Sequence, residues 1–210
     1  TVDKSGIVTN HANIVAGDWT HYGDRWYYYD ADMNPYIGVK TINGVKYYFE
    51  WEGRLATRTY EGIWVITFDR QLIAYNQNGV VTDQQDIVGN KWIEFNGGKY
   101  YFDSELTPYS GIQTIDGVEY YFNYGQLAEY LDEVVTSGDT LAYVRDGKVI
   151  EKAKFKDNEL IYLNGNCYYY YLNDAGYYYP YDGEYTVDGK SLYFIYGMLQ
   201  TSDSDEILSK

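Results

Sequence analysis

Residues 41–53 of this 210-residue chain read TINGVKYYFEWEG, a pattern typical of a tight β-hairpin. Asn43 and Gly44 are a two-residue turn signal, because both tolerate the positive φ that a type I′ turn requires at its two central positions. Such a turn fixes the register of the flanking strands, so we expect Gly38 to lie opposite Phe49. Alternating strand residues then face opposite sides of the hairpin.

The hairpin sequence occurs three times along the chain. The sequence reads TIDGVEYYFNYG at 114–125 and TVDGKSLYFIYG at 186–197, and the first two copies align without a gap over about 25 residues. A single hairpin cannot bury its own apolar face, so repeated hairpins stack on their neighbours. Repeats of roughly 20 residues are typical of such arrays. We therefore predict an all-β fold, a solenoid of stacked β-hairpin repeats.

The composition supports an all-β chain and excludes two classes of partner. Tyr, Trp and Phe number 29, 5 and 7, and Gly numbers 21; strands favour aromatic residues and turns favour Gly. The net charge of −15 opposes binding to nucleic acid or to an anionic membrane surface. Because the chain has no apolar run of 18 residues, we expect no membrane insertion. The sequence sets no oligomeric state.

We expect one continuous repeat domain. The copies and their linking segments occupy residues 17–203, which we predict to be a single β-hairpin repeat domain. Residues 1–16 form an N-terminal lead-in and residues 204–210 a C-terminal tail. The chain does not begin with Met, which indicates a trimmed or mature fragment.

Each copy carries an aromatic residue where turn chemistry does not require one. Trp51, Tyr124 and Tyr196 lie in the short turn after the second strand, one or two positions before a Gly. Turn formation alone favours Gly, Asn or Asp at such positions. Either these rings pack on the next hairpin or they form exposed platforms for a flat ligand.

A second recurring aromatic lies in the middle of the YYF or LYF motif. Tyr48, Tyr121 and Tyr193 keep the phenol in all three copies. They are either half-buried residues whose hydroxyls reach water or backbone, or ligand contacts. Lys40 and Gln113 occupy a variable strand position where they can supply polar contacts to a ligand, or else be solvated or packed.

The run YYYYLNDAGYYYPY at residues 168–181 has two interpretations. It is either the richest binding surface of the chain or a terminal cap whose rings cover the last layer of the core. We favour the cap.

No catalytic residue, metal site or cofactor is predicted. The two histidines, His11 and His21, lie outside the recurring hairpins, and no nucleophile motif or phosphate-binding loop occurs. The run that begins at Asp30 resembles the start of a calcium loop, but Pro35 stands where such a loop requires Gly. Cys167 aligns with a lysine of the second copy, which indicates an incidental thiol.

The repeated TINGVKYYF and GIQTIDGVEYYF motifs resemble the cell-wall-binding repeat superfamily over roughly residues 17–200. That superfamily includes choline-binding repeats, the glucan-binding repeats of glucansucrases and the carbohydrate-binding repeats of large clostridial toxins. The resemblance implies a β-solenoid with ligands between successive hairpins. Choline-binding repeats carry a Gly-Trp pair before the hairpin, whereas this chain has Gly-Val, Gly-Ile and Gly-Glu. Because a cation–π cage needs several aromatic faces, the pattern is closer to the glucan-binding and toxin types.

We therefore expect a noncatalytic carbohydrate-binding module of a secreted or cell-surface bacterial-type protein, with a glucan or another cell-wall glycan as its partner. Aromatic platforms between hairpins are the expected binding elements. The alternatives are a choline-type cell-wall anchor and a structural spacer with no ligand.

Tryptophan fluorescence separates these three hypotheses. If the chain binds glucan, its fluorescence changes on addition of dextran or starch, because a sugar displaces water from exposed indole rings. A choline-type anchor responds to choline instead. A signal that is unchanged by every one of these ligands identifies a spacer.

Overall fold

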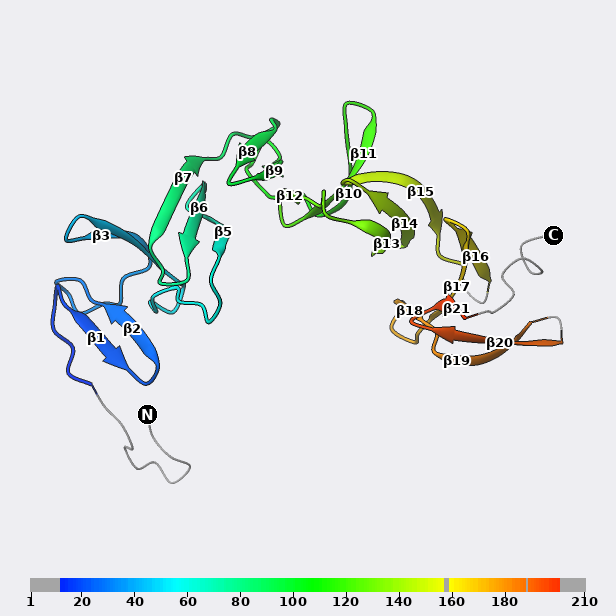
Figure 1. The fold of residues 1–210 in the computed structure, drawn as a ribbon, viewed down its shortest axis with the longest axis horizontal. Helices are drawn as coiled ribbons and strands as arrows, with labels where there is room; N and C mark the ends of the chain where they lie inside the picture. The colour runs from blue at the N-terminus through cyan, green and yellow to red at the C-terminus, as the bar shows by residue number, and fades with distance from the viewer. Residues whose placement is uncertain (1–11, 157–158, 188, 201–210) are drawn as a thin grey trace, which may run out of the picture. The chain divides into compact units, whose positions relative to one another are not determined.

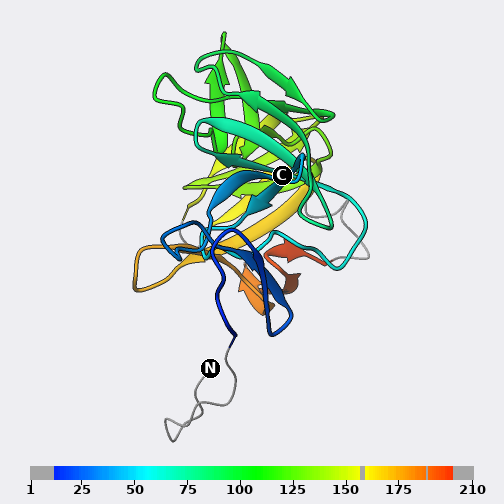
Figure 2. The ribbon, with the colours of Figure 1, turned by 90° about the vertical axis from the view of Figure 1, so that its left-hand side faces the viewer.

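The structure of the chain, a computed structural model, describes residues 12–156, 159–187 and 189–200. Within these ranges every regular element is a β-strand, and all recorded strand pairs are antiparallel (Figures 1 and 2). The predicted all-β class is therefore confirmed. The described part of the chain contains no helix long and apolar enough to cross a membrane.

The chain divides into two compact units, one of residues 1–99 and 104–106 and the other of residues 100–103 and 107–210. Residues 1–11 of the predicted lead-in, including His11, lie outside the described residues, as does the predicted tail 204–210. The domain limits drawn from the sequence stay predictions.

The first unit consists of hairpins and one three-stranded sheet. In chain order its strands are β1 (Trp19–Tyr22), β2 (Arg25–Tyr28), β3 (Gly38–Ile42), β4 (Val45–Phe49), β5 (Ile63–Phe68), β6 (Gln71–Asn76), β7 (Val81–Asp86), β8 (Ile93–Phe95) and β9 (Gly98–Tyr100), the last of which ends at the boundary between the units. The hairpins β1–β2 and β3–β4 are two-stranded, and β5, β6 and β7 pair in sequence order. The sheets of the described residues are open, not closed into barrels.

The second unit repeats this plan. Its strands are β10 (Gly111–Ile115), β11 (Val118–Asn123), β12 (Gln126–Leu127), β13 (Asp132–Ser137), β14 (Thr140–Arg145), β15 (Lys148–Lys154), β16 (Leu160–Leu163), β17 (Asn166–Leu172), β18 (Tyr178–Pro180), β19 (Gly183–Val187), β20 (Lys190–Ile195) and β21 (Met198–Leu199). The hairpin β10–β11 followed by β13, β14 and β15 corresponds to β3–β4 followed by β5, β6 and β7.

The hairpin register is the predicted one in the first copy. Gly38 pairs with Phe49, and Asn43 and Gly44 in the turn have φ values of 50° and 83°. The second and third copies repeat the pairing of Gly with Phe. In the third copy, Asp188 of the predicted turn lies outside the described residues.

The last residue of each YYF or LYF motif anchors the core. Phe49, Phe122 and Phe194 are at most 1% exposed. Complete burial of a phenylalanine stabilises the fold by about 1.5–3 kcal/mol. The recurrence of this residue therefore follows from packing.

All three prolines of the chain make one equivalent contact. Each ring lies against the glycine that follows a tip aromatic; the pairs are Pro35 with Gly53, Pro108 with Gly125, and Pro180 with Gly197. A Cβ on the glycine would overlap Pro35 in the first copy, and would lie 3.1 Å and 3.0 Å from the proline Cβ in the second and third. These glycines also have φ values of 75–89°. The close contact and the positive φ together favour glycine at this position.

Cys167 belongs to the core. Its side chain is 5% exposed, and burial raises the pKa of the thiol to about 11. The thiol is therefore neutral at physiological pH and poorly reactive, in keeping with an incidental residue.

The proline–glycine contact predicts a difference between two alanine substitutions. Gly44→Ala adds a methyl group in open space at positive φ, which costs about 1–2 kcal/mol. Gly53→Ala bears the same backbone strain and also collides with Pro35, so we expect a further loss of about 1–3 kcal/mol. Urea unfolding followed by fluorescence measures both losses. Equal losses in the two variants would show that the contact contributes nothing.

Candidate functional site

The three tip aromatics are exposed, as the interpretation that they form platforms for a flat ligand required. Trp51, Tyr124 and Tyr196 are 74%, 81% and 79% exposed. These rings therefore do not pack on a neighbouring hairpin. Each copy offers a largely free aromatic ring at the tip of a tight turn.

Two of the tips have a strained backbone. Tyr124 and Tyr196 are the first central residues of two-residue turns, closed by the pairs Asn123–Gln126 and Ile195–Met198. Their φ values are 47° and 48°. A bulky residue in this left-handed region costs about 1–2 kcal/mol, so Asn, Asp or Gly normally occupies it.

The same chain places better suited residues in its other tight turns. Asn43 and Asp116 occupy the corresponding position of the turns between β3 and β4 and between β10 and β11, with φ near 50°. Backbone strain that supports no internal contact indicates a role for the side chain outside the chain. The tip tyrosines are therefore candidate contact residues.

Ion pairs between side chains hold the first tip in place. Its turn is longer by one residue, and the Glu50 backbone N–H donates to the Arg54 carbonyl oxygen at 2.8 Å. The Glu50 carboxylate accepts hydrogen bonds from the Arg54 guanidinium and, at 2.8 Å, from Arg58. Partial burial opposes ionisation of Glu50, but the hydrogen bonds from Arg58 and Arg54 outweigh it and lower the pKa of the carboxyl. The turn that carries Trp51 is therefore rigid.

The other two tips are fixed by backbone hydrogen bonds. The Gly125 N–H donates to the Tyr109 carbonyl oxygen at 2.7 Å, and the Gly197 N–H donates to that of Tyr181 at 2.9 Å. The Asp182 carboxylate also accepts from the Tyr196 backbone N–H at 2.5 Å. Preorganised rings lose little conformational freedom when a ligand binds.

The middle tyrosine does not form a repeated platform. Tyr48 is only 3% exposed and its ring lies 5.3 Å from that of Tyr75, so the prediction that Tyr48 contacts a ligand is wrong. Burial raises the pKa of its phenol to about 12. The sheet β5–β7 covers this side of the hairpin. Tyr121 is partly buried and Tyr193 is 50% exposed, and their contact with a ligand stays a prediction.

The two predicted polar contacts are engaged within their own repeats. Lys40 Nζ lies 4.8 Å from the centre of the Tyr36 ring, and Gln113 Nε2 donates to the Ser110 carbonyl oxygen at 3.0 Å. Both side chains are partly buried. A direct role for them in ligand binding stays a prediction.

The tyrosine-rich run 168–181 divides between core and surface. Tyr168, Tyr169 and Tyr170 are at most 7% exposed, whereas Tyr177 is 66% exposed. The run is thus partly core, as the cap interpretation expects, and partly surface.

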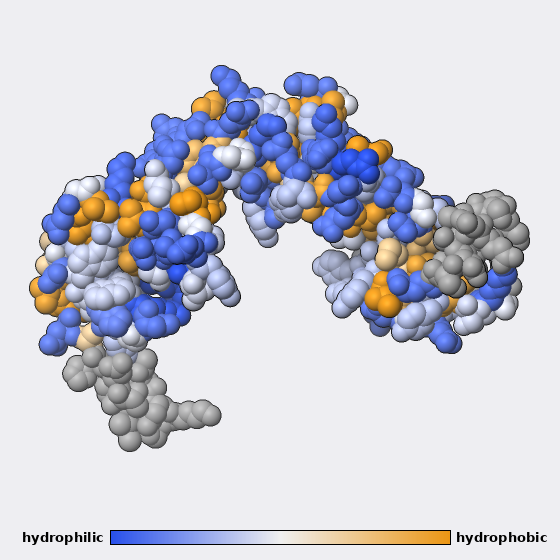
Figure 3. All heavy atoms as spheres, viewed as in Figure 1, coloured by the Kyte–Doolittle hydropathy of each residue, from blue (hydrophilic) through white to orange (hydrophobic). Residues whose placement is uncertain are grey.

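Sequence reasoning missed two further exposed rings. Tyr60 and Tyr130 are 78% and 70% exposed and lie in the loops between a tip and the following sheet. Each follows a Leu-Ala pair within a few residues, which is the signal that could have found them. Exposed tyrosines do not stand out in the hydropathy view, because Tyr is nearly neutral on this scale (Figure 3). On the face shown, apolar residues lie in small groups among hydrophilic ones.

The Asp30 carboxylate closes a turn. Its Oδ1 accepts from the backbone N–H groups of Asp32 and Asn34, both at 2.9 Å. Among the described residues, no group of three or more His, Cys, Asp or Glu side chains is placed to hold a metal ion.

Together, the fold and the site define a protein built from repeated β-hairpins that present rigid, exposed aromatic tips.

No family model matches the chain. It is 28% identical over 173 residues to glucosyltransferase-S of Streptococcus mutans, covering 81% of this chain and 10% of that protein. It is 29% identical over 211 residues to glucosyltransferase-I of Streptococcus downei, covering 87% of this chain and 12% of that protein. The chain thus spans about a tenth of each relative, and these matches confirm the resemblance given above to the cell-wall-binding repeat superfamily.

Two solved structures are similar at lower identity. Alternansucrase in complex with isomaltononaose is 20% identical with a TM-score of 0.28, over 88% of this chain and 16% of that one. Choline binding protein F from Streptococcus pneumoniae is 19% identical with a TM-score of 0.26, over 89% of this chain and 58% of that one.

The strained tip predicts a substitution that stabilises the fold. Tyr124→Asn places in the left-handed turn a residue that tolerates it, so the free energy of unfolding rises by about 1 kcal/mol. The matched control is Tyr60→Asn, which removes an equally exposed ring at ordinary φ. The midpoint of urea unfolding increases for the first variant only. No gain at Tyr124 would show that the turn is not strained by its tyrosine.

Proposed function

We propose that the chain is a noncatalytic carbohydrate-binding module, which binds a glucan or another cell-wall glycan through its aromatic tips. Trp51, Tyr124 and Tyr196 are the principal contact residues. The observation that carries the proposal is the combination of 74–81% exposure with left-handed backbone at two of the three tips. Neither property helps the chain to fold.

The chemistry of the tips suits a sugar. A pyranose ring presents a face of C–H groups that stacks on a flat aromatic ring, and a rim of hydroxyls that pairs with polar side chains. The absence of tryptophan in the Gly-Val, Gly-Ile and Gly-Glu pairs opposes a choline cage. The net charge of −15 favours a neutral glycan over an anionic one.

Repetition explains why weak sites suffice. A single exposed ring buries little area against a ligand, so each tip binds weakly. Two linked sites on a repetitive glycan raise the overall affinity by about 10²–10⁴. The three copies therefore make one avid module.

The remaining parts of the proposal follow from the repeats. The hairpins stack as a solenoid, so that each repeat contacts chiefly its neighbours. The module belongs to a secreted or cell-surface protein of bacterial type, whose partner is the polysaccharide. Any catalytic activity of a longer parent protein lies outside this module.

Affinity electrophoresis in gels that contain dextran tests the proposal. Trp51→Ala, Tyr124→Ala and Tyr196→Ala each remove one stacking ring, worth about 1 kcal/mol or roughly fivefold in affinity. The triple variant loses retardation almost completely, because avidity disappears along with the individual contacts. Tyr60→Ala is the matched control, since it removes an equally exposed ring away from the tips.

Each other outcome has a definite meaning. Retardation that is the same in the triple variant and the native chain would remove the tips from the site. Release of the chain from the gel by choline would favour a cell-wall anchor of the choline type. If neither dextran nor a panel of wall glycans retards the native chain, the module is a spacer.

A further inference from the structure

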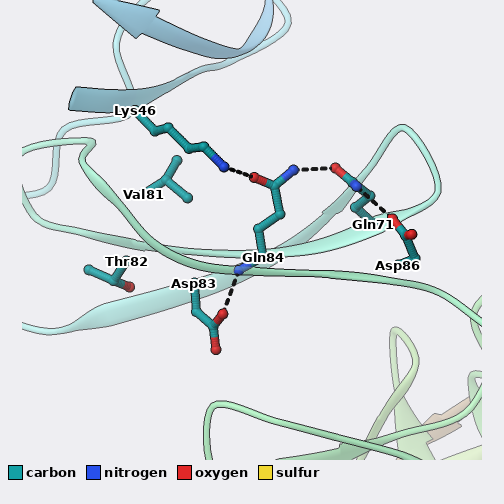
Figure 4. Close-up of a pocket in the computed structure, with 7 residues that line it drawn as sticks. All are labelled: Lys46, Gln71, Val81, Thr82, Asp83, Gln84 and Asp86. Atoms are coloured by element: carbon teal, nitrogen blue, oxygen red, sulfur yellow. Dashed lines mark hydrogen bonds between the residues drawn. The ribbon is translucent and has the colours of Figure 1, made fainter. Parts of the chain in front are cut away.

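The first unit contains a polar groove that the tips do not explain. A cavity of about 500 Å³ lies between hairpin β3–β4 and the sheet β5–β7 (Figure 4). Seven side chains from β4, β6 and β7 line it: Lys46, Gln71, Val81, Thr82, Asp83, Gln84 and Asp86. None of them is aromatic, so this groove cannot bind a ligand by stacking.

A row of hydrogen bonds runs along the groove. Lys46 Nζ donates to Gln84 Oε1 at 3.0 Å, and Gln84 Nε2 donates to Gln71 Oε1 at 2.5 Å. Gln71 Nε2 then donates to Asp86 Oδ1 at 2.6 Å. Figure 4 shows the four polar groups in one line, from the lysine of β4 to the aspartate of β7. An ammonium at one end and a carboxylate at the other orient both amides in the same direction.

This row leaves binding capacity unused. A primary amide has two N–H donors and two carbonyl lone pairs, and the row uses one of each in Gln71 and in Gln84. Gln71 pairs with Asp86 across the strands and Gln84 lies two residues before Asp86, so all three share one face of the sheet. Each amide therefore retains one N–H donor and one acceptor lone pair that the row does not use.

The second copy has ion pairs at the same positions. Glu119 occupies the register position of Lys46, since each faces a threonine in its hairpin. Lys152 occupies that of Gln84 and forms an ion pair with Glu119 at 2.5 Å. Lys154, at the position of Asp86, forms an ion pair with Asp139 at 2.7 Å.

The difference between the two copies shows which part of the contact between hairpin and sheet serves packing. In the second copy a single ion pair, between Glu119 of the hairpin and Lys152 of the sheet, joins the two without an amide row. The first copy replaces this ion pair with a row of amides beside a cavity. The amides are therefore not needed for packing alone, which points to a ligand.

The lining selects the class of ligand. The lining includes two carboxylates and one ammonium, so an anionic ligand is repelled, and no aromatic ring is present to hold a flat apolar group. Fixed alternating donors and acceptors match hydroxyl groups, each of which donates one hydrogen bond and accepts others. The ligand that fits is a neutral polyol.

We propose that this groove is a second carbohydrate site, in which Lys46, Gln84 and Gln71 bind the hydroxyl edge of a neutral sugar. The inference rests on the proposed function for the class of ligand. It assigns to the first copy a hydrogen-bonding site that is chemically distinct from the stacking sites at the tips.

Titration of the full ¹⁵N-labelled chain with isomaltotriose, a neutral trisaccharide, tests the groove by NMR. The side-chain amide signals of Gln71 and Gln84 shift and saturate. The double variant Lys46→Glu with Gln84→Lys copies the ion pair of the second repeat, so it keeps the hairpin contact while removing the amide row. In that variant the Gln71 shift is lost or the affinity at the groove falls about tenfold, as expected for the loss of one or two hydrogen bonds.

Two controls accompany the titration. The reciprocal variant Glu119→Lys with Lys152→Gln alters the second copy and leaves the shifts at Gln71 and Gln84 unchanged. Equal midpoints of urea unfolding show that both double variants are folded. Glucuronic acid leaves the groove signals in place; if it shifts them as strongly as isomaltotriose does, the assignment to neutral sugars is overturned.

The groove and the tips can fail separately. Shifts at the groove that persist in the triple tip variant establish the groove as an independent site. If isomaltotriose shifts the tip residues but not Gln71 or Gln84, the groove proposal is overturned while the proposed function stands. If groove shifts persist in the double variant of the first copy, the amide row is not the site. If no signal moves, the groove proposal is overturned, and retardation by dextran or the wall glycans decides the proposed function by itself.

Discussion

Each repeat is closed by a proline ring that packs against the glycine after the tip aromatic, and each contains a fully buried phenylalanine. A Cβ at this glycine would clash in the first copy and be tightly crowded in the other two, and the φ of the glycine is positive. The chain must therefore reverse direction within two or three residues. In two copies the residue directly before this glycine is the tip tyrosine, and its own backbone is left-handed. The closure of the repeat thus fixes where the tip lies, whereas turn formation does not itself require an aromatic residue there.

Under the two proposals, the same scaffold supports two kinds of binding chemistry. At the tips, rigid turns present rings to solvent, where a sugar face can stack. Between hairpin β3–β4 and the sheet β5–β7, amide side chains line a polar groove instead. The second copy uses ion pairs at the positions where the first uses amides. A repeat can therefore gain or lose a site by exchanging a few surface side chains, while its buried phenylalanine and its proline contact stay unchanged.

The differences among the three middle tyrosines show why local sequence is insufficient. Tyr48 and Tyr193 have similar neighbours in the sequence, yet one is 3% exposed and the other 50%. Tyr48 is covered by Phe68 and Tyr75, which belong to strands that follow later in the chain. The side of a hairpin that a residue faces is a local property. What covers that side is decided by non-local packing, so the ligand role assigned to Tyr48 was wrong.

The sequence by itself determined the β-hairpins, their register and the position of the tip aromatics. These depend on two-residue turns and strand alternation, which act over a few residues. The tertiary structure alone decided which tyrosines are buried, that the tips at Tyr124 and Tyr196 are strained, and where the groove lies. Lys46 and Gln84 are far apart in the chain and meet only because β4 packs beside β7. Contacts of this kind depend on how whole hairpins pack, and no short stretch of sequence encodes them.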